Sequence, residues 1–157
     1  MKALTTILKS GKIKIIDIPP PQLSSGSLLV QNYYSLISAG TESATIKDSK
    51  KGYIGKARSR PDQVKKVIDS FKNQGPTSTY RNVMKKLDAY SPMGYSSAGK
   101  IIGIGDDVEG FSLGDYVACS GVGYANHAEV VSVPKNLCIK LHHDANLKNA
   151  CYNSPGG

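Results

Sequence analysis

The amino-acid sequence predicts a mainly β protein with added helices, an α+β fold in which a β-barrel or roll carries an inserted helical hairpin. On both sides of residues 45–90, short segments rich in β-branched and apolar residues recur at close spacing, bounded by Gly, Pro and Asp turns. Residues 45–90 nearly lack this pattern and carry apolar residues at helical spacing instead. We therefore expect helices inserted into a framework of mostly antiparallel strands.

The framework begins with two segments, residues 2–8 and 12–18, which flank Ser10-Gly11 and predict a hairpin. Pro19-Pro20-Pro21 ends the second segment, because proline cannot donate to a strand ladder. The turn signals and apolar content that follow indicate further strands. These are expected at residues 27–37, 97–104, 115–120, 128–133 and 137–141.

The run from Gly103 to Val108 begins like a dinucleotide-binding loop, but it lacks the third glycine and no helix pattern follows it. We interpret Gly103 and Gly105 as turn residues that need positive φ between two strands. A dinucleotide needs a Gly-rich turn between a strand and a helix of a parallel sheet, and the sequence shows no such unit. The cofactor-binding residues are therefore unknown.

Residues 45–90 contain 12 Lys and Arg against 4 Asp and Glu, so the whole net charge of +8 arises in this segment. Pro61 opens one predicted helix, which Gly75 ends. The second predicted helix has Thr77 as its N-cap and Ser91-Pro92 as its stop. The cations fit either a solvated helix face or a site for an anionic ligand such as nucleic acid or a sugar nucleotide. The aromatic residues of the two predicted helices, Phe71 and Tyr80, belong to their apolar spacing and do not form a stacking platform among the cations, which favours the solvated face over nucleic-acid binding.

Composition also bears on the compartment. The longest apolar stretches fall far short of the roughly 20 residues that a membrane-spanning helix needs. Lys9 and Lys12 follow the N-terminus too closely for a secretory apolar region, so we expect a cytoplasmic protein without a membrane partner. Cys119, Cys138 and Cys151 are odd in number and lack C-x-x-C spacing, which predicts free, buried thiols.

Three runs carry a resemblance to a known family: Gly94 to Gly99 (GYSSAG), Ile104 to Val108 (IGDDV) and Phe111 to Val117 (FSLGDYV), the last being the most specific. They resemble the N-terminal, GroES-like catalytic domain of the medium-chain dehydrogenase/reductase family, as in its alcohol and threonine dehydrogenases. Ser38 to Glu42 fits the early active-site loop of that family. The resemblance covers almost the whole chain apart from the inserted hairpin, which looks like the one in a zinc-poor branch often associated with polysaccharide biosynthesis.

The resemblance implies a GroES-like domain over residues 1–143, with residues 45–90 as its inserted basic hairpin. Residues 144–157, with Asp144 as the N-cap of a short helix, are expected to start the connection to an absent Rossmann cofactor domain. Complete enzymes of the family transfer a hydride between NAD or NADP and an alcohol or carbonyl in the cleft between the two domains. We therefore expect the substrate-side domain of such an oxidoreductase, truncated or excised and inactive alone, with a sugar or sugar nucleotide among its candidate small-molecule substrates.

The family's zinc-binding positions are altered in this chain. Zinc members place Cys in a C-G-T-D motif and His-Glu in a G-H-E motif, and the matching positions here are Ala39 and Tyr95-Ser96. Catalytic zinc needs about three protein ligands from Cys, His or carboxylate. The remaining imidazoles, His127, His142 and His143, do not sit at the matching positions. The resemblance thus implies a zinc-independent enzyme with no metal ligands.

Without zinc, Tyr95 is the candidate to polarise the substrate oxygen, because a phenol can donate a hydrogen bond to a developing oxyanion. Thr41 and Ser38 complete the expected catalytic group as hydroxyl donors. The alternative for Tyr95 is that it only fills the space of the absent metal site. Glu42 is expected to brace the loop, with contact to the substrate as its alternative role. The other expected cleft-lining residues are Ala39, Gly40, Glu42 and Ser96.

A non-catalytic binding or interaction module on the same barrel is the competing hypothesis, since fold alone does not choose between the two. The sequence leaves open the substrate, the choice between NAD and NADP, and whether the chain forms a homo-oligomer.

Overall fold

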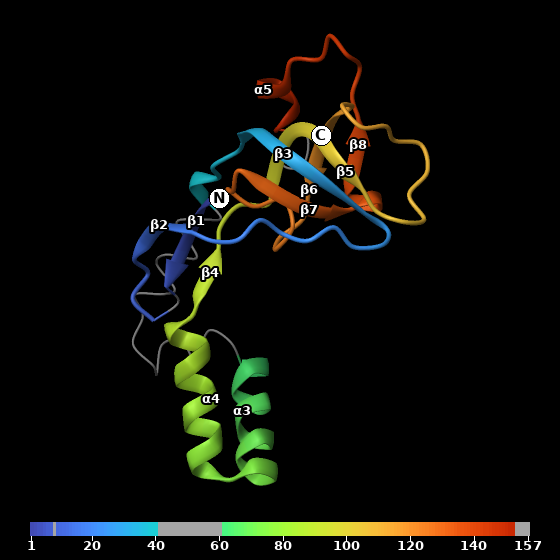
Figure 1. Cartoon of the computed structure of the whole chain (residues 1–157). Helices are drawn as coiled ribbons and strands as arrows, with labels where there is room; N and C mark the ends of the chain where they lie inside the picture. Colours follow the sequence, from blue (N-terminus) through green and yellow to red (C-terminus); the bar gives the residue numbers. More distant parts are fainter. Residues whose placement is uncertain (8, 41–60, 153–157) are drawn as a thin grey trace. The chain divides into compact units, whose positions relative to one another are not determined.

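The computed structural model describes residues 1–7, 9–40 and 61–152 (Figure 1). Contacts within the chain divide it into two compact units. Among the described residues, the first unit comprises residues 1–5, 14–38 and 92–152, and the second comprises 6–7, 9–13, 39–40 and 61–91. The predicted boundary between residues 1–143 and 144–157 stays a prediction.

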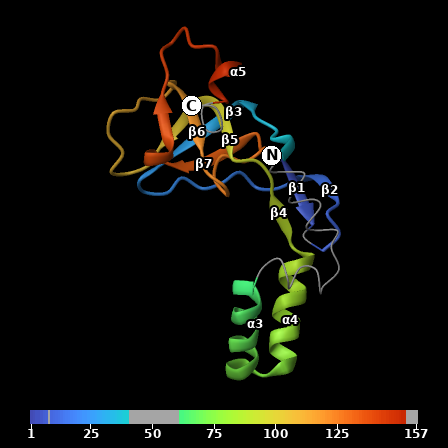
Figure 2. The same ribbon diagram turned by 180° about the vertical axis from the view of Figure 1, so that it is seen from behind.

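The first unit is built on a five-stranded sheet with the order β7-β3-β5-β6-β8, in which every neighbouring pair is antiparallel. The sheet curls into a half-barrel, which can be followed from behind in Figure 2. This confirms the predicted mainly β, GroES-like fold class. The strands are β3 (Ser27–Ser35), β5 (Ser96–Ile104), β6 (Tyr116–Ser120), β7 (Val130–Pro134) and β8 (Cys138–Lys140), with a 3-10 turn, η1 (Lys135–Leu137), before the last.

A three-stranded sheet contains β2 (Ile13–Asp17), β1 (Lys2–Ile7) and β4 (Tyr90–Pro92) in that order. The first two strands confirm the hairpin expected around Ser10-Gly11, where Gly11 has a φ of 66°. Strand β4 was not predicted, because Ser91-Pro92 was interpreted only as a helix stop. Proline is compatible with a strand at the edge of a sheet, and β4 is an edge strand.

The core of the first unit follows from the period of two along its strands. Leu28 and Val30 of β3 are fully buried and face the same side, as alternate strand residues do. Other large apolar side chains that are fully buried are Ile101, Val117 and Val133. Cys119 and Cys138 belong to the same core cluster.

The described cysteines are free and buried, as predicted. Cys119 and Cys138 are register partners on β6 and β8, and their Sγ atoms lie 3.7 Å apart. The hydrogen bond with the Cys138 thiol and burial both raise the pKa of Cys119. Cys119 is therefore held as a thiol at neutral pH and behaves as a small core residue.

Two helices, α3 (Pro61–Gln74) and α4 (Pro76–Asp88), lie in the second unit and contact each other as the predicted hairpin. The start at Pro61 is confirmed. Thr77 as the N-cap of α4 is wrong, because the cap is Gly75 with a φ of 81° and the helix begins at Pro76. Proline is favoured at the first helical position, because an N–H there would have no partner within the helix.

The interpretation of Gly103 and Gly105 as positive-φ turn residues is also wrong. The positive φ of this segment is adopted by Asp107, at 65°. Gly105 is needed for space instead: a Cβ there would meet the carbonyl oxygen of Ser24 and lie 2.9 Å from that of Ser27. Gly105 thus permits the close approach of two backbone segments.

The last described helix, α5 (Leu147–Ala150), is short. Asn146 caps it, with Oδ1 accepting a hydrogen bond of 3.2 Å from the amide of Asn149. The expectation of Asp144 as the cap is therefore wrong, and the Asp144 carboxylate lies against His142 and His143 instead. In the described part of the chain, no helix is long and apolar enough to span a bilayer.

Candidate functional site

Tyr95 lies half-buried in the bend directly before β5. Its carbonyl oxygen accepts a hydrogen bond of 2.8 Å from the amide of Gly121. The preceding residue, Gly94, has a φ of 94°, and a Cβ there would lie 2.8 Å from both the amide nitrogen and Nδ1 of His127. The backbone on both sides of Tyr95 is thus fixed by one hydrogen bond and by the close approach of His127.

The segment containing Ser38 runs beside the start of β5. Ser35 and Ser97 are register partners, and the Leu36 amide donates a 3.0 Å hydrogen bond to the carbonyl oxygen of Ser96. Ser38 follows two residues later and is half-buried. The fold therefore brings two of the sequence-predicted segments, those of Ser38 and of Tyr95-Ser96, to adjacent strand ends.

Ser96 is only 1% exposed, and its Oγ donates a 2.6 Å hydrogen bond to the carbonyl oxygen of Cys151. This bond fastens the residue after α5 to β5. Ser96 already uses its hydroxyl proton within the fold, so Tyr95 is the better-placed donor of the two for a substrate.

The remaining predicted site residues belong to the second unit or fall outside the description. Ala39 and Gly40 are exposed and helical in local conformation. Thr41 and Glu42 lie outside the described residues. Their proposed roles therefore stay predictions.

Sequence reasoning missed a pair that lies at the same strand ends. Nδ1 of His127 is 2.9 Å from Oγ of Ser35, and His127 is 9% exposed. Its backbone also links two other segments, donating 2.8 Å to the Met93 carbonyl and accepting 2.8 Å from the Leu4 amide. Ser35 and His127 are 92 residues apart, so no local signal in the sequence pairs them.

Donor chemistry argues against catalytic zinc at the family's positions. Ala39 offers only a methyl group, Tyr95 offers a phenol, and the Ser96 hydroxyl is buried and already donates to Cys151. Thiolate, imidazole and carboxylate are the usual zinc ligands. The side chains at these positions do not fit the metal.

An open hollow of about 320 Å³, which the sequence did not predict, lies elsewhere on the first unit. Its polar centre is the pair Asp115 and Lys140, with Oδ2 and Nζ 2.7 Å apart. The hydrogen bond from Lys140, followed by a 2.7 Å bond from the Ser112 amide, lowers the pKa of Asp115. The lining residues are Gly114, Asp115, Tyr116, Lys140, Leu141, His142 and His143.

Asp115→Asn is expected to lower the melting temperature at neutral pH, because the amide cannot replace the charged acceptor between Lys140 and Ser112. The folded-state pKa lies below the unfolded value of about 3.9, so the stabilisation is present above that pH and is lost as pH falls through the folded pKa. The melting temperatures of the unaltered protein and of Asp115→Asn, measured from neutral pH down to about pH 2, should therefore converge at the acid end. Asp106→Asn, at an exposed aspartate, is the control; equal melting temperatures for all three proteins at neutral pH would contradict the assignment.

The chain matches no protein-family model and no curated protein by sequence. It is similar to three solved structures, among others. The quinone oxidoreductase from Coxiella burnetii is 19% identical, with 96% of this chain aligned to 40% of that one at a TM-score of 0.61. Galactitol-1-phosphate dehydrogenase from Escherichia coli is 14% identical, with 99% of this chain aligned to 42% of that one at a TM-score of 0.65. The quinone oxidoreductase from Escherichia coli, solved with NADPH, is 14% identical, with 96% of this chain aligned to 36% of that one at a TM-score of 0.58.

These neighbours are medium-chain dehydrogenases/reductases, and the likeness establishes the shared fold. The chain spans between 36% and 42% of their lengths.

Proposed function

We propose that this chain is the substrate-side part of an NAD(P)-dependent oxidoreductase of the medium-chain type, acting on an alcohol or carbonyl. One observation supports the proposal. Nearly the whole chain aligns with less than half the length of each of two solved oxidoreductases. The quinone oxidoreductase from Escherichia coli was solved with NADPH, which supports a nicotinamide cofactor. A Rossmann domain is the proposed partner, because the described residues contain no strand, Gly-rich turn and helix in the arrangement that binds a dinucleotide.

In this proposal the nicotinamide, when bound by the partner domain, supplies or accepts the hydride. Tyr95 donates its phenolic hydrogen bond to the substrate oxygen on which negative charge develops. Ser38 and Thr41 position the same oxygen, Ala39 and Gly40 keep the cleft wall small, and Glu42 braces the loop. The altered donor set supports a zinc-independent reaction.

The finer proposals concern substrate and compartment. A sugar or sugar nucleotide is the proposed substrate class, supported by the resemblance of residues 45–90 to the hairpin of the polysaccharide-associated branch. The cytoplasm is the proposed compartment, supported by three buried cysteines that are free.

Tyr95→Phe is expected to lower kcat by about 100-fold or more, the scale of losing one proton-donating group, with little change in KM. The measurement is NAD(P)H oxidation with a panel of quinones, aldehydes, ketones and nucleotide sugars, using the protein encoded by the complete reading frame. Tyr90→Phe, at a half-exposed tyrosine of β4, is the matched control. Unchanged turnover in Tyr95→Phe removes the catalytic role of Tyr95.

The reading frame itself separates the competing functions. A strand, a Gly-rich turn and a helix encoded directly after residue 157 would support the oxidoreductase. A natural stop codon at that point would favour the non-catalytic binding module.

A further inference from the structure

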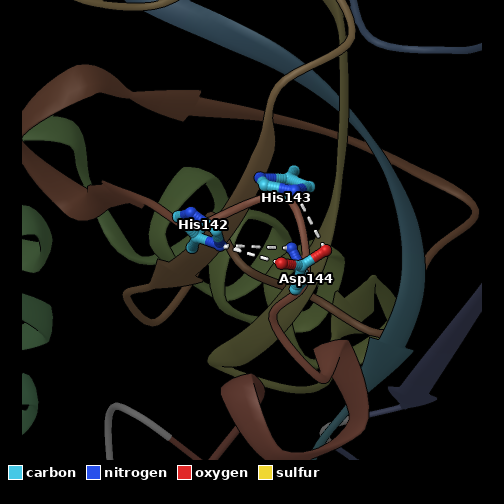
Figure 3. A group of neighbouring side chains, drawn as sticks. All are labelled: His142, His143 and Asp144. Atoms are coloured by element: carbon cyan, nitrogen blue, oxygen red, sulfur yellow. Dashed lines mark hydrogen bonds and ion pairs between the residues drawn. The ribbon is translucent and has the colours of Figure 1, made fainter.

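Between β8 and α5, a loop carries two adjacent histidines and an aspartate whose side chains gather at the surface (Figure 3). The Asp144 carboxylate directs one oxygen to each ring. Oδ2 lies 3.5 Å from Nδ1 of His142, and Oδ1 lies 3.0 Å from Nε2 of His143. One ligand atom from each of the three residues lies within 4.8 Å of the others.

These separations suit a shared metal ion. Ligands held about 2.0–2.2 Å from one zinc ion in a tetrahedral arrangement lie ~3.3–3.5 Å from one another. The two nitrogen-to-oxygen distances, 3.5 Å and 3.0 Å, are close to that value, although they run to different oxygens of Asp144. One ligand atom from each residue lies within 4.8 Å of the other two, so the exposed side chains must rotate to close around one ion.

The lone pairs are also accessible. Nδ1 of His142 accepts from the Asp144 amide at 3.4 Å, which is long for a hydrogen bond, so little is lost when a metal takes that lone pair. The two imidazole centroids are 4.2 Å apart. Two protonated rings at this separation would repel each other, whereas one divalent cation between neutral rings and a carboxylate is attracted by all three groups.

We propose that His142, His143 and Asp144 bind one divalent transition-metal ion of the Zn²⁺, Ni²⁺ or Cu²⁺ class. Two imidazole nitrogens and a carboxylate favour these ions over Mg²⁺ and Ca²⁺, which prefer oxygen ligands. The site is separate in sequence from Ala39 and Tyr95-Ser96, and it does not depend on the proposed oxidoreductase function.

Three protein ligands leave coordination positions open on such an ion. His142 and His143 both line the hollow that contains Lys140. Because Lys140 is already paired with Asp115, water from this hollow is the ligand expected to complete the coordination shell.

Isothermal titration of the full, reduced, metal-free chain with NiCl₂ and with ZnCl₂ tests the site. We expect one ion per chain. His142→Ala and His143→Ala should each weaken binding by at least about tenfold, since loss of even an outer-shell partner costs about 10–100-fold. Asp144→Asn should weaken binding as well. Asp106→Asn is the matched control and should bind as the unaltered chain does.

The side chains are 71%, 78% and 74% exposed, so these variants are expected to fold, which circular dichroism checks. Amide NMR with Cu²⁺ gives an independent readout, with broadening centred on residues 142–144. Absence of binding up to millimolar metal would overturn the proposal. Equal binding by the His142→Ala/His143→Ala double variant would overturn it too, because the ion would then be held by other groups such as the cysteines.

Discussion

Replacement of Gly99 by alanine is expected to lower the free energy of unfolding of the first unit by more than about 3 kcal/mol or to prevent folding. A Cβ at this position would meet the carbonyl oxygen of Gln31 and lie 2.8 Å from its carbon and 2.9 Å from Cα of Asn32. These are backbone atoms of β3. They cannot move aside cheaply, because β3 is paired with β5 on one side and with β7 on the other.

Urea unfolding followed by circular dichroism measures this effect. Gly103→Ala is the matched control, because Gly103 lies on the same strand and the nearest atom to its added Cβ is the side-chain Cβ of Leu29, at 3.2 Å. A side chain can shift by a few tenths of an ångström, so the control should change by less than about 1 kcal/mol. If both variants unfold at the same urea concentration, this result would contradict the close approach of the β3 backbone to Gly99 of β5.

The contrast between these glycines shows what periodicity can predict. Alternation of apolar residues locates β3 and β5, because burial of one sheet face imposes a period of two. The need for glycine at position 99 depends on an irregularity of register in β3 between Asn32 and Tyr34. Such a distortion is a property of the paired strands and leaves no local signal in the sequence.

The candidate site divides in the same way. Motif resemblance identifies Ser38 and Tyr95, and the antiparallel pairing of β3 with β5 explains why their segments meet. His127 is brought to Ser35 only by the long-range fold, since 92 residues separate them. The cluster at His142, His143 and Asp144 is local and could be seen in the sequence, but its significance depends on side-chain directions that only coordinates supply.

Leu28→Ala is expected to cost about 2–5 kcal/mol, because it deletes buried carbon atoms and leaves a cavity that the sheet cannot fully close. Leu28 is 0% exposed, and its register partners are Ile104 on β5 and Val133 on β7. All three belong to or pack against one core cluster. Loss of packing at Leu28 is therefore felt by both neighbouring strands.

The measurement is again urea unfolding, with Leu113→Ala as the control at a leucine that is 68% exposed and should change stability by no more than about 0.5 kcal/mol. Equal losses in the two variants would contradict a core centred on β3. Leu28 lies near the start of β3 and Ser35 at its end, so the folded variant should keep the contact between Ser35 and His127. If stability falls while the His127 ring signal in NMR stays unchanged, the packing at Leu28 and the contact between Ser35 and His127 are independent of each other. This is expected when two sites are distant and share no partners.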